Sequence, residues 1–162
     1  MKKTRSQTSS MMPRSIGFTV PGVCQPAGSK RFVGVKGGRG IVLDANKNAA
    51  GWKERVALAA AEAKQKAGYR EPWAGPLHLI VHVQRARPRG HFTSKGAVRA
   101  TAPAFPVTKP DLTKLIRGIE DALTGIIWID DSQVVSQTAI KYWHDEPGVR
   151  VWVRDYGEAN NS

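Results

Sequence analysis

Five carboxylates crowd into a short window of a chain that is otherwise rich in Lys and Arg. They are Asp111, Glu120, Asp121, Asp130 and Asp131. Carboxylate oxygens that converge on one point are the ligands that Mg²⁺ prefers, and bound Mg²⁺ activates water and stabilises charge on an attacked phosphate. The chemistry that this window could perform is therefore metal-assisted cleavage of phosphodiester bonds, provided that the fold brings the carboxylates together.

Each carboxylate of the window also has an ordinary structural explanation. Asp111 precedes a helical pattern and is typical of a helix N-cap. The segment Asp130-Asp131-Ser132 is typical of a polar turn. Asp121 follows Arg117 by one helical turn, a spacing at which opposite charges form an ion pair. Taken singly, these residues favour structural roles.

The spacing of Asp111 and Asp131 does not settle whether they meet. The helix expected between them has about 14 residues and spans roughly 21 Å. The strand-like segment 126–129 that follows reaches back at most about 14 Å. The residues alone therefore leave it open whether one chain can bring both carboxylates to the same ion.

The charge of the whole chain indicates a polyanionic partner. Lys and Arg number 25 against 13 Asp and Glu, a net charge of +12. No acidic residue precedes Asp44, and none lies between Glu71 and Asp111, so the excess is spread over the chain and not confined to a basic tail. A field of this sign favours nucleic acid over a role in solubility alone. The basic residues expected to contact DNA are Lys30, Arg31, Arg85, Arg87, Arg89, Lys109 and Lys114.

The hydrophobic pattern predicts two helices and several strands in one α/β (α+β) domain over residues 15–156. Strands are expected at 16–20, 77–85, 134–143 and 149–154, a hairpin at 32–43 with a glycine-rich tip, and helices at 48–67 and 111–124. Trp52 is expected to anchor the first helix in the core. Residues 1–14 are expected to form a disordered basic arm, and residues 157–162 a disordered tail.

Two further segments each have both a functional and a structural interpretation. His78 and His82 lie on an expected strand about 13 Å apart, too far for one metal ion, so both are expected to be surface histidines. The segment 86–108 follows no periodic pattern and is rich in Pro, Gly and Arg. It is either a solvated loop or a mobile flap that contacts phosphates, and we favour the flap because it leads directly to Asp111.

Cysteine and hydropathy indicate the cellular compartment. Cys24 is the only cysteine, so neither an intrachain disulfide nor a Cys-based zinc site can form. No apolar run approaches the roughly 20 residues that span a bilayer, and residues 1–14 do not resemble a signal peptide. We expect a cytoplasmic protein, neither secreted nor membrane-bound.

The segment around the carboxylates resembles a known family. Lys109-Pro-Asp-Leu-Thr-Lys-Leu-Ile-Arg-Gly-Ile-Glu-Asp-Ala-Leu-Thr-Gly125 is followed by Ile126-Ile-Trp-Ile-Asp-Asp-Ser-Gln-Val-Val135. This run is similar to the RusA family of Holliday junction resolvases, whose pattern is Lys-Pro-Asp-x-Asp, a helix with a basic residue, Asp-Ala-Leu and Asp-Asp-x-Gln-Val-Val. A weaker similarity extends to Pro26-Ala-Gly-Ser-Lys-Arg31 and Trp52, and in outline over most of residues 16–156.

The resemblance implies a specific activity. Proteins of this family are small α/β homodimers, expected here as a small mixed sheet with two main helices packed on it. They bind four-way DNA junctions and other branched DNA and nick symmetric strands with Mg²⁺, for which Mn²⁺ could substitute. Their catalytic and metal-binding aspartates correspond to Asp111 and Asp131, and their basic catalytic residue corresponds to Arg117. Such a protein would act in a bacterial or phage-infected cell.

One position departs from the family pattern. Thr113 stands where the family has a second aspartate, and a neutral hydroxyl is a weaker ligand for Mg²⁺ than a carboxylate. Asp130 could assist Asp111, Asp131 and Thr113 in holding the metal. Three functions remain: a Mg²⁺-dependent endonuclease for branched DNA, a catalytically weak or inactive junction-binding protein of the same fold, and a basic nucleic-acid chaperone or packaging protein.

Overall fold

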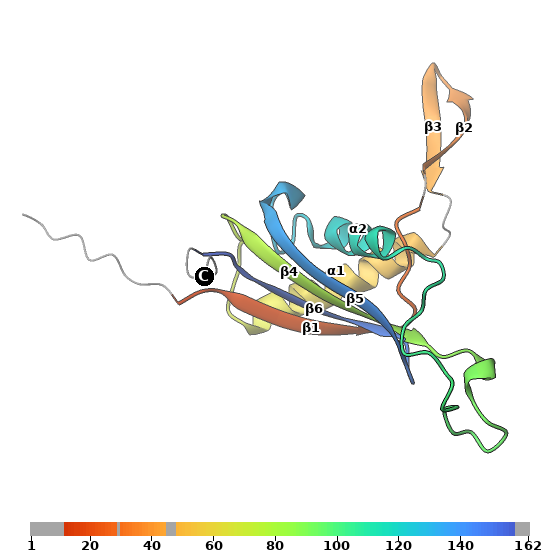
Figure 1. Ribbon diagram of the computed structural model, residues 1–162. Coiled ribbons are helices and arrows are strands. Elements are labelled where there is room, and N and C mark those ends of the chain that lie inside the picture. The colour runs from red at the N-terminus through yellow and green to blue at the C-terminus, as the bar shows by residue number, and fades with distance from the viewer. Residues whose placement is uncertain (1–11, 29, 45–47, 158–162) are drawn as a thin grey trace, which may run out of the picture.

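A four-stranded sheet and two helices form the body of the protein. The computed structural model describes residues 12–28, 30–44 and 48–157 (Figure 1). In chain order the elements are β1 (Ser15–Pro21), β2 (Lys30–Lys36), β3 (Arg39–Asp44), α1 (Ala49–Lys66), β4 (Leu77–Ala86), the 3₁₀ turn η1 (Arg89–His91), α2 (Leu112–Leu123), the 3₁₀ turn η2 (Asp131–Gln133), β5 (Val134–His144) and β6 (Gly148–Asp155).

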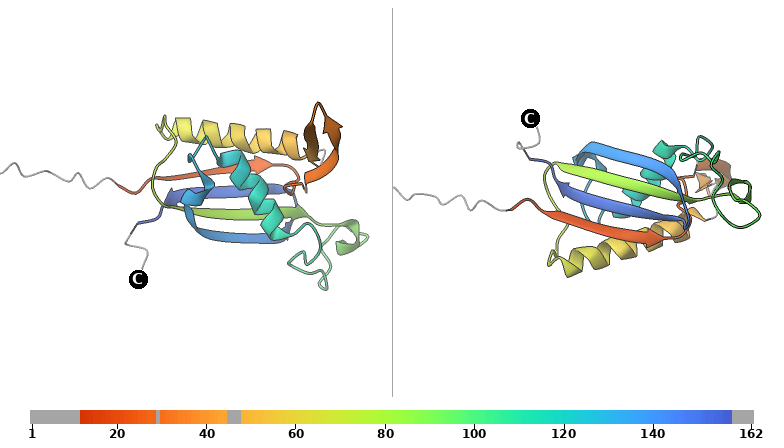
Figure 2. Two further views of the ribbon diagram at one scale, coloured as in Figure 1. Left: turned by 90° about the horizontal axis from the view of Figure 1, so that it is seen from above. Right: turned by 60° about the horizontal axis from the view of Figure 1, so that its bottom comes forward.

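The main sheet is mixed, with strand order β1-β6-β4-β5. β6 runs antiparallel to both β1 and β4, whereas β5 runs parallel to β4. Figure 2 shows both helices on one face of this sheet, with the opposite face left uncovered by either. The expected fold, a small mixed sheet with two main helices packed on it, is confirmed. β2 and β3 pair only with each other and stand away from the body in Figure 1.

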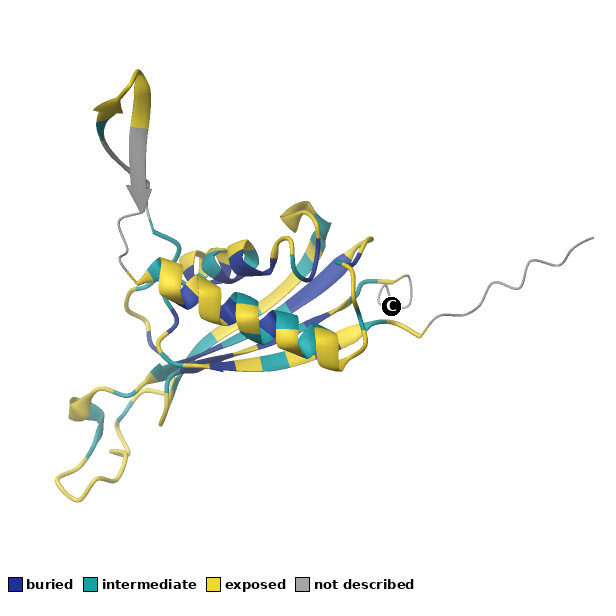
Figure 3. Cartoon of the chain, turned by 180° about the vertical axis from the view of Figure 1, so that it is seen from behind, coloured by how far each residue is buried: buried dark blue, intermediate teal, exposed yellow. Residues whose placement is uncertain are grey.

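The helices form where the apolar periodicity predicted them. Along α2 the buried side chains are Leu115, Ile116, Ile119, Ala122 and Leu123, and along α1 they are Trp52, Val56 and Ala60. Full burial of each large aliphatic side chain contributes about 1.5–3 kcal/mol relative to exposure. Figure 3 shows these buried stripes facing the sheet while the outer surfaces of the helices are exposed. The packing of α2 against β5 and α1 fixes where its two ends lie.

The segment after α2 differs from the expected strand. Residues 126–129 form a compact turn, in which the Gly125 amide donates to the Trp128 carbonyl at 2.6 Å. The Trp73 amide donates to the Ile127 carbonyl at 2.7 Å, and Ile127 and Trp128 are fully buried. This apolar run therefore fills the core as a turn and does not run back along the helix.

The expectation that His78 lies on the surface is wrong. Its side chain is only 8% exposed, whereas His82 is half-buried. The Arg154 guanidinium and the Thr138 hydroxyl bond to the two nitrogens of the His78 ring at 3.1 Å each. Burial and the nearby Arg154 charge lower the pKa of His78 below its usual value, which favours the neutral ring.

Arg14, which was expected in the disordered arm, is fixed to the end of the sheet. Its Nη2 lies 2.7 Å from Oδ1 of Asp155 and 2.8 Å from the Ala74 carbonyl oxygen, and its guanidinium covers the Trp73 ring. Burial acts to raise the pKa of Asp155, but the hydrogen bonds and charge of Arg14 lower it. Residues 1–11 of the expected arm and 158–162 of the expected tail lie outside the described residues. No helix in the described part of the chain is both long and apolar enough to cross a bilayer.

Candidate functional site

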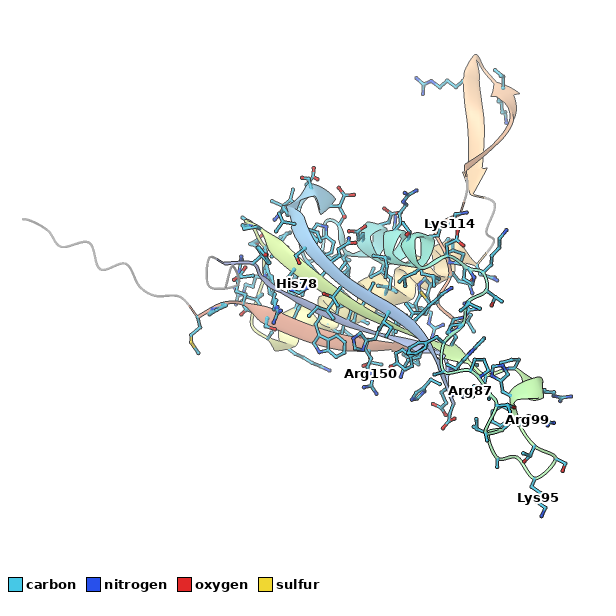
Figure 4. All side chains as sticks on the ribbon, viewed as in Figure 1. His78, Arg87, Lys95, Arg99, Lys114 and Arg150 are labelled. Carbon is cyan, nitrogen blue, oxygen red and sulfur yellow. The ribbon has the colours of Figure 1, made fainter. Side chains whose placement is uncertain are left out.

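A basic cavity lies beside the first turn of α2. It has a volume of about 590 Å³, and its lining includes Arg85, Lys109, Asp111 and Lys114. Arg85 comes from the end of β4, and the two lysines stand on either side of Asp111 in the sequence. Lys114, labelled in Figure 4, is exposed on the first turn of α2. Three cations and one carboxylate thus surround a space that can hold a phosphate group.

One wall of this cavity is the segment 23–28, which is held against α2 by a close approach at Gly118. The Ala27 amide donates to the Lys114 carbonyl at 2.9 Å. A Cβ at Gly118 would lie 3.2 Å from the Gln25 carbonyl oxygen and 3.3 Å from the Ala27 amide nitrogen. The absence of a side chain at Gly118 therefore allows the segment to pack on α2 and shape the cavity.

Asp111 occupies the N-cap position of α2 without acting as a side-chain cap. Its backbone is extended, with φ −66° and ψ 139°, but its carboxylate makes no capping hydrogen bond, and the residue is exposed. The capping role that the sequence suggested is thus not its role in this structure. Its carboxylate stays available to a cation or to a polar group of a ligand in the basic cavity.

A second group of polar residues lies between the middle of α2 and β5. Thr113, Arg117, Glu120 and Gln137 line a cavity of about 220 Å³. The Gln137 side-chain amide donates to the Glu120 carboxylate. Burial, followed by the charge of Asp131, raises the pKa of Glu120. The sequence analysis gave Glu120 no role, although it follows Thr113 by seven residues and so shares a helix face with it.

The remaining carboxylates gather around the C-terminal end of α2. Asp121, Asp130 and Asp131 line a cavity of about 410 Å³ together with Lys53 of α1. Asp130 caps η2, because its Oδ1 accepts a hydrogen bond from the Ser132 amide at 2.8 Å. Hydrogen bonds from the side chain and the backbone of Ser132 lower the pKa of Asp130. Asp130 thus has the structural role that a polar turn predicts, while Asp131 is exposed next to it.

Asp111 and Asp131 are not brought together within one chain. They lie at opposite ends of α2, whose 12 residues span about 18 Å. In the described part of the chain, three or more His, Cys, Asp or Glu side chains nowhere gather closely enough to hold a metal ion. The expected pair of Arg117 and Asp121 is also not formed, since Arg14–Asp155 is the one salt bridge among the described residues.

The segment 86–108 has internal structure that was not expected of a flap. The Arg87 guanidinium donates to the Pro103 carbonyl at 2.9 Å, and Arg99 donates to the Phe92 carbonyl at 2.9 Å. Arg89 and Lys95 are exposed on it, and Figure 4 shows Lys95 at its tip. These two cations face solvent, whereas Arg87 stabilises the loop itself.

Lys30, Arg31 and Cys24 remain to be placed. Lys30 and Arg31 lie on β2, in the projecting hairpin. Cys24 is buried, and burial raises the pKa of its thiol to about 12. Because the thiolate is the reactive form of cysteine, Cys24 is a packing residue.

Two comparisons with known proteins extend this description. The family model described as "Endodeoxyribonuclease RusA" matches residues 21–154 of the chain. A protein of Bacillus subtilis (strain 168), named "Uncharacterized protein YqaN", is 33% identical over 106 residues, which make up 64% of this chain and 72% of that protein. The family match includes α1, α2 and the cavities at both ends of α2.

Proposed function

The chain belongs to the RusA family of endodeoxyribonucleases, and from this premise we propose that it cleaves Holliday junctions and other branched DNA. The observation that carries the proposal is the family match over residues 21–154, which includes Asp111, Arg117 and Asp131. The proposed reaction is hydrolysis of a phosphodiester bond, with Asp111, Asp131 and Arg117 as the catalytic residues.

The basic cavity supports this proposal because its charge suits a DNA phosphate. Arg85, Lys109 and Lys114 line it together with Asp111. Cations that neutralise phosphates release counterions, which favours binding and makes it salt-dependent. The positive end of the α2 dipole adds to the attraction at the same point. In this proposal the three cations hold the backbone while Asp111 faces it.

Mg²⁺, with Mn²⁺ as a substitute, is the metal we propose from the family resemblance. The residues of one chain do not fit a single ion shared by Asp111 and Asp131, because these two lie at opposite ends of α2. An ion bound by both requires an assembly of two chains or a rearrangement of the segment after α2. We therefore derive no step of the reaction through the metal.

A homodimer is the assembly that we propose. A four-way junction offers two equivalent strands, and a twofold dimer presents one copy of each site to each strand. Two chains would also supply two copies of Asp111 and Asp131 to one assembly. Sedimentation of the full chain would show a mass twice the 17.7 kDa of one chain if this is correct.

A second function, binding of junctions without cleavage, is favoured by two specific observations. Thr113 replaces a family carboxylate at the first turn of α2, and Asp111 and Asp131 are separated within one chain. Both features weaken a metal site without removing the cations that bind DNA. A chain that has lost its metal site would retain the basic cavity.

The experiment that separates these functions uses a labelled four-way junction and a linear duplex of the same length. The full chain is incubated with each DNA in Mg²⁺, in Mn²⁺ and in EDTA. Metal-dependent nicks in the junction support the endonuclease. Tight junction binding without nicks in either metal supports the second function, and equal binding of junction and duplex without nicks contradicts both.

A further inference from the structure

The face of the main sheet opposite the helices is an open surface formed by all four strands. Figure 2 shows it without either helix upon it. The strand register places Gly17, Trp152, Ile80 and Thr138 side by side across this face, in the order of the strands. The hydrophobic core and both helices cover the other face of the sheet, so this face is the one that neither helix covers.

The open face is basic. Among the four strands, all within the described part of the chain, the residues that alternate onto this face include no Asp or Glu. They are Ser15, Gly17, Thr19 and Pro21 of β1, His78, Ile80, His82, Gln84 and Ala86 of β4, Ser136, Thr138, Ile140, Tyr142 and His144 of β5, and Gly148, Arg150, Trp152 and Arg154 of β6. Arg150 and Arg154 are exposed, and Figure 4 shows Arg150 directed away from the helices. This surface therefore attracts polyanions.

Trp152 lies across the neighbouring strand at the centre of the face. A Cβ at Gly17 of β1 would be 2.7 Å from Cδ1 and 3.0 Å from Nε1 of the indole, so only glycine leaves room for the ring there. The His82 ring of β4 also contacts the Trp152 ring, edge to face, with a centroid distance of 5.1 Å and an interplanar angle of 71°. Trp152 is half-buried and is thus a fixed, partly exposed aromatic ring beside two arginines.

Arg154 is also held in place. Its guanidinium donates to Nδ1 of His78 at 3.1 Å, and Nε2 of the same ring contacts the Thr138 hydroxyl at 3.1 Å. Among the described residues no carboxylate forms a salt bridge with Arg154, and the neighbouring Asp155 is paired with Arg14. The arginine therefore keeps its positive charge available while its position on the sheet is fixed.

We propose that this open face binds a single-stranded segment of DNA, with a base stacked on Trp152 and backbone phosphates at Arg150 and Arg154. A base–aromatic stack needs an unpaired base, because the faces of paired bases are covered by their neighbours in a duplex. Cationic side chains beside an aromatic ring are a recurring arrangement in proteins that bind single strands.

A second copy of the chain fits the same face poorly. Arg150 and Arg154 lie on β6, an inner strand of the sheet. Two copies packed face to face would bring four arginines into an interface to which these strand faces contribute no carboxylate. Burial of unpaired charges is strongly unfavourable. Charge complementarity thus favours DNA over a partner of the same sequence.

This contact goes beyond the proposed nuclease site, which lies on α2 at the opposite side of the sheet. The inference rests on the proposed function only in taking DNA as the polyanion. It does not require cleavage, so a binding assay in EDTA tests it separately. An inactive protein that binds single strands through Trp152 would contradict the nuclease and leave this inference intact.

The test measures fluorescence anisotropy of labelled oligothymidine of about 15 nucleotides, a length within typical site sizes, with the full chain in EDTA. Trp152→Leu is expected to weaken this binding about tenfold, and Trp152→Phe, which keeps a ring, to weaken it less. Duplex binding by both variants should stay close to that of the parent protein. Thermal unfolding of each variant checks that any loss of binding is not caused by loss of folding. If Trp152→Leu does not fold, the comparison of Trp152→Phe with the parent protein still tests the proposal.

The arginines are tested by salt dependence, with a matched control. Replacing Arg150 and Arg154 by Gln is expected to flatten the log–log salt slope by about 1.4, or 0.7 for each single-strand phosphate contact. The control replaces Lys66 and Arg70, two exposed cations near the end of α1, and should leave the slope unchanged. Unchanged oligothymidine affinity in Trp152→Leu, or an equal loss with duplex, would overturn the proposal. A folded Trp152→Leu protein that sediments as a monomer while the parent sediments as a dimer would also overturn it, by assigning the face to a second copy.

Discussion

The two ends of α2 carry opposite charge although they belong to one short helix. At the first turn, Arg85, Lys109 and Lys114 surround the single carboxylate of Asp111. At the C-terminal end, Asp121, Asp130 and Asp131 line a cavity whose one cation among the described lining residues is Lys53. A DNA backbone along α2 would be attracted at the first turn and repelled beyond the last. The first end therefore suits a phosphate, and the second end needs a bound cation before it can approach one.

The largest effect is expected when a carboxylate is removed from either end. Asp111→Asn and Asp131→Asn each keep the size of the side chain but remove its charge. If the proposed function is correct, each lowers junction cleavage by about a hundredfold or more, since even residues that only orient a metal ligand contribute 10–100-fold. Junction affinity should be equal or higher in both variants, because a negative charge near the phosphates is gone. Single-turnover cleavage and gel-shift assays measure the two quantities.

Asp145→Asn is the matched control for these two variants, because Asp145 is exposed in the turn between β5 and β6. It should cleave at the rate of the parent protein. If Asp111→Asn cleaves as fast as Asp145→Asn, Asp111 is not part of the site.

The next largest effect is expected on the salt dependence of junction binding when the lysines of the basic cavity are replaced. Replacing Lys109 and Lys114 by Gln is expected to flatten the log–log salt slope of junction binding by about 1.8, or 0.9 for each duplex phosphate contact. If parent and variant bind equally at high salt, a slope change of this size makes the variant's affinity about tenfold lower when the salt concentration is reduced fourfold. The Lys66 and Arg70 double variant is again the control. Equal slopes in the two double variants would show that the basic cavity does not contact DNA.

A smaller effect is expected at Thr113, where the family carboxylate is missing. Thr113→Asp adds an anion in the first turn of α2, a position that the helix dipole favours. We expect the Mg²⁺ concentration for half-maximal cleavage to fall by up to about tenfold, because ligand charge tunes affinity for such cations. Thr113→Asn, which adds similar bulk without charge, should leave it unchanged. An unchanged Mg²⁺ requirement in Thr113→Asp would show that this position does not hold metal.

The smallest expected effect concerns the pH dependence of stability near the acidic end. Burial and the charge of Asp131 raise the pKa of Glu120, so the folded state binds the proton more tightly than the unfolded state. The stability that protonation of this carboxyl contributes is present below its unfolded pKa of about 4.5 and is lost as pH rises through its raised folded pKa. Glu120→Gln should be at least as stable as the parent protein at neutral pH, and its advantage should shrink as pH falls through the raised folded pKa of Glu120 toward 4.5. Thermal unfolding between pH 4 and pH 8 measures it, and an advantage that grows at low pH would contradict the sign.

Elements marked by a pattern of neighbouring residues were predicted well, whereas features that depend on contacts between distant segments were not. The apolar spacing of α2 predicted the helix to within one residue at each end, because one strongly periodic face was enough. The short run 126–129 carried no such period, so a buried turn could not be told from a strand. His78 was assigned to the surface because alternation along β4 does not reveal that Arg154 and Tyr156 pack beside it.

The separation of the site residues was only partly predictable. Helix length already showed that Asp111 and Asp131 could lie far apart, but their final positions depend on the buried turn between them. The contact of Trp152 with Gly17 joins the two ends of the chain through the pairing of β1 with β6. No pattern in the sequence specifies that pairing, so the open face could be found only in the structure.

The central claim, that this chain is a nuclease for branched DNA, is tested most directly by adding metal to a preformed complex. The full chain is bound at saturation to a labelled four-way junction in EDTA, and excess Mg²⁺, or Mn²⁺ in a parallel sample, is then added. The account predicts that nicks appear in opposite strands only after metal addition, and that a bound linear duplex of the same length stays intact. A junction complex that persists without a single nick in either metal would contradict the account and identify the chain as a binding protein.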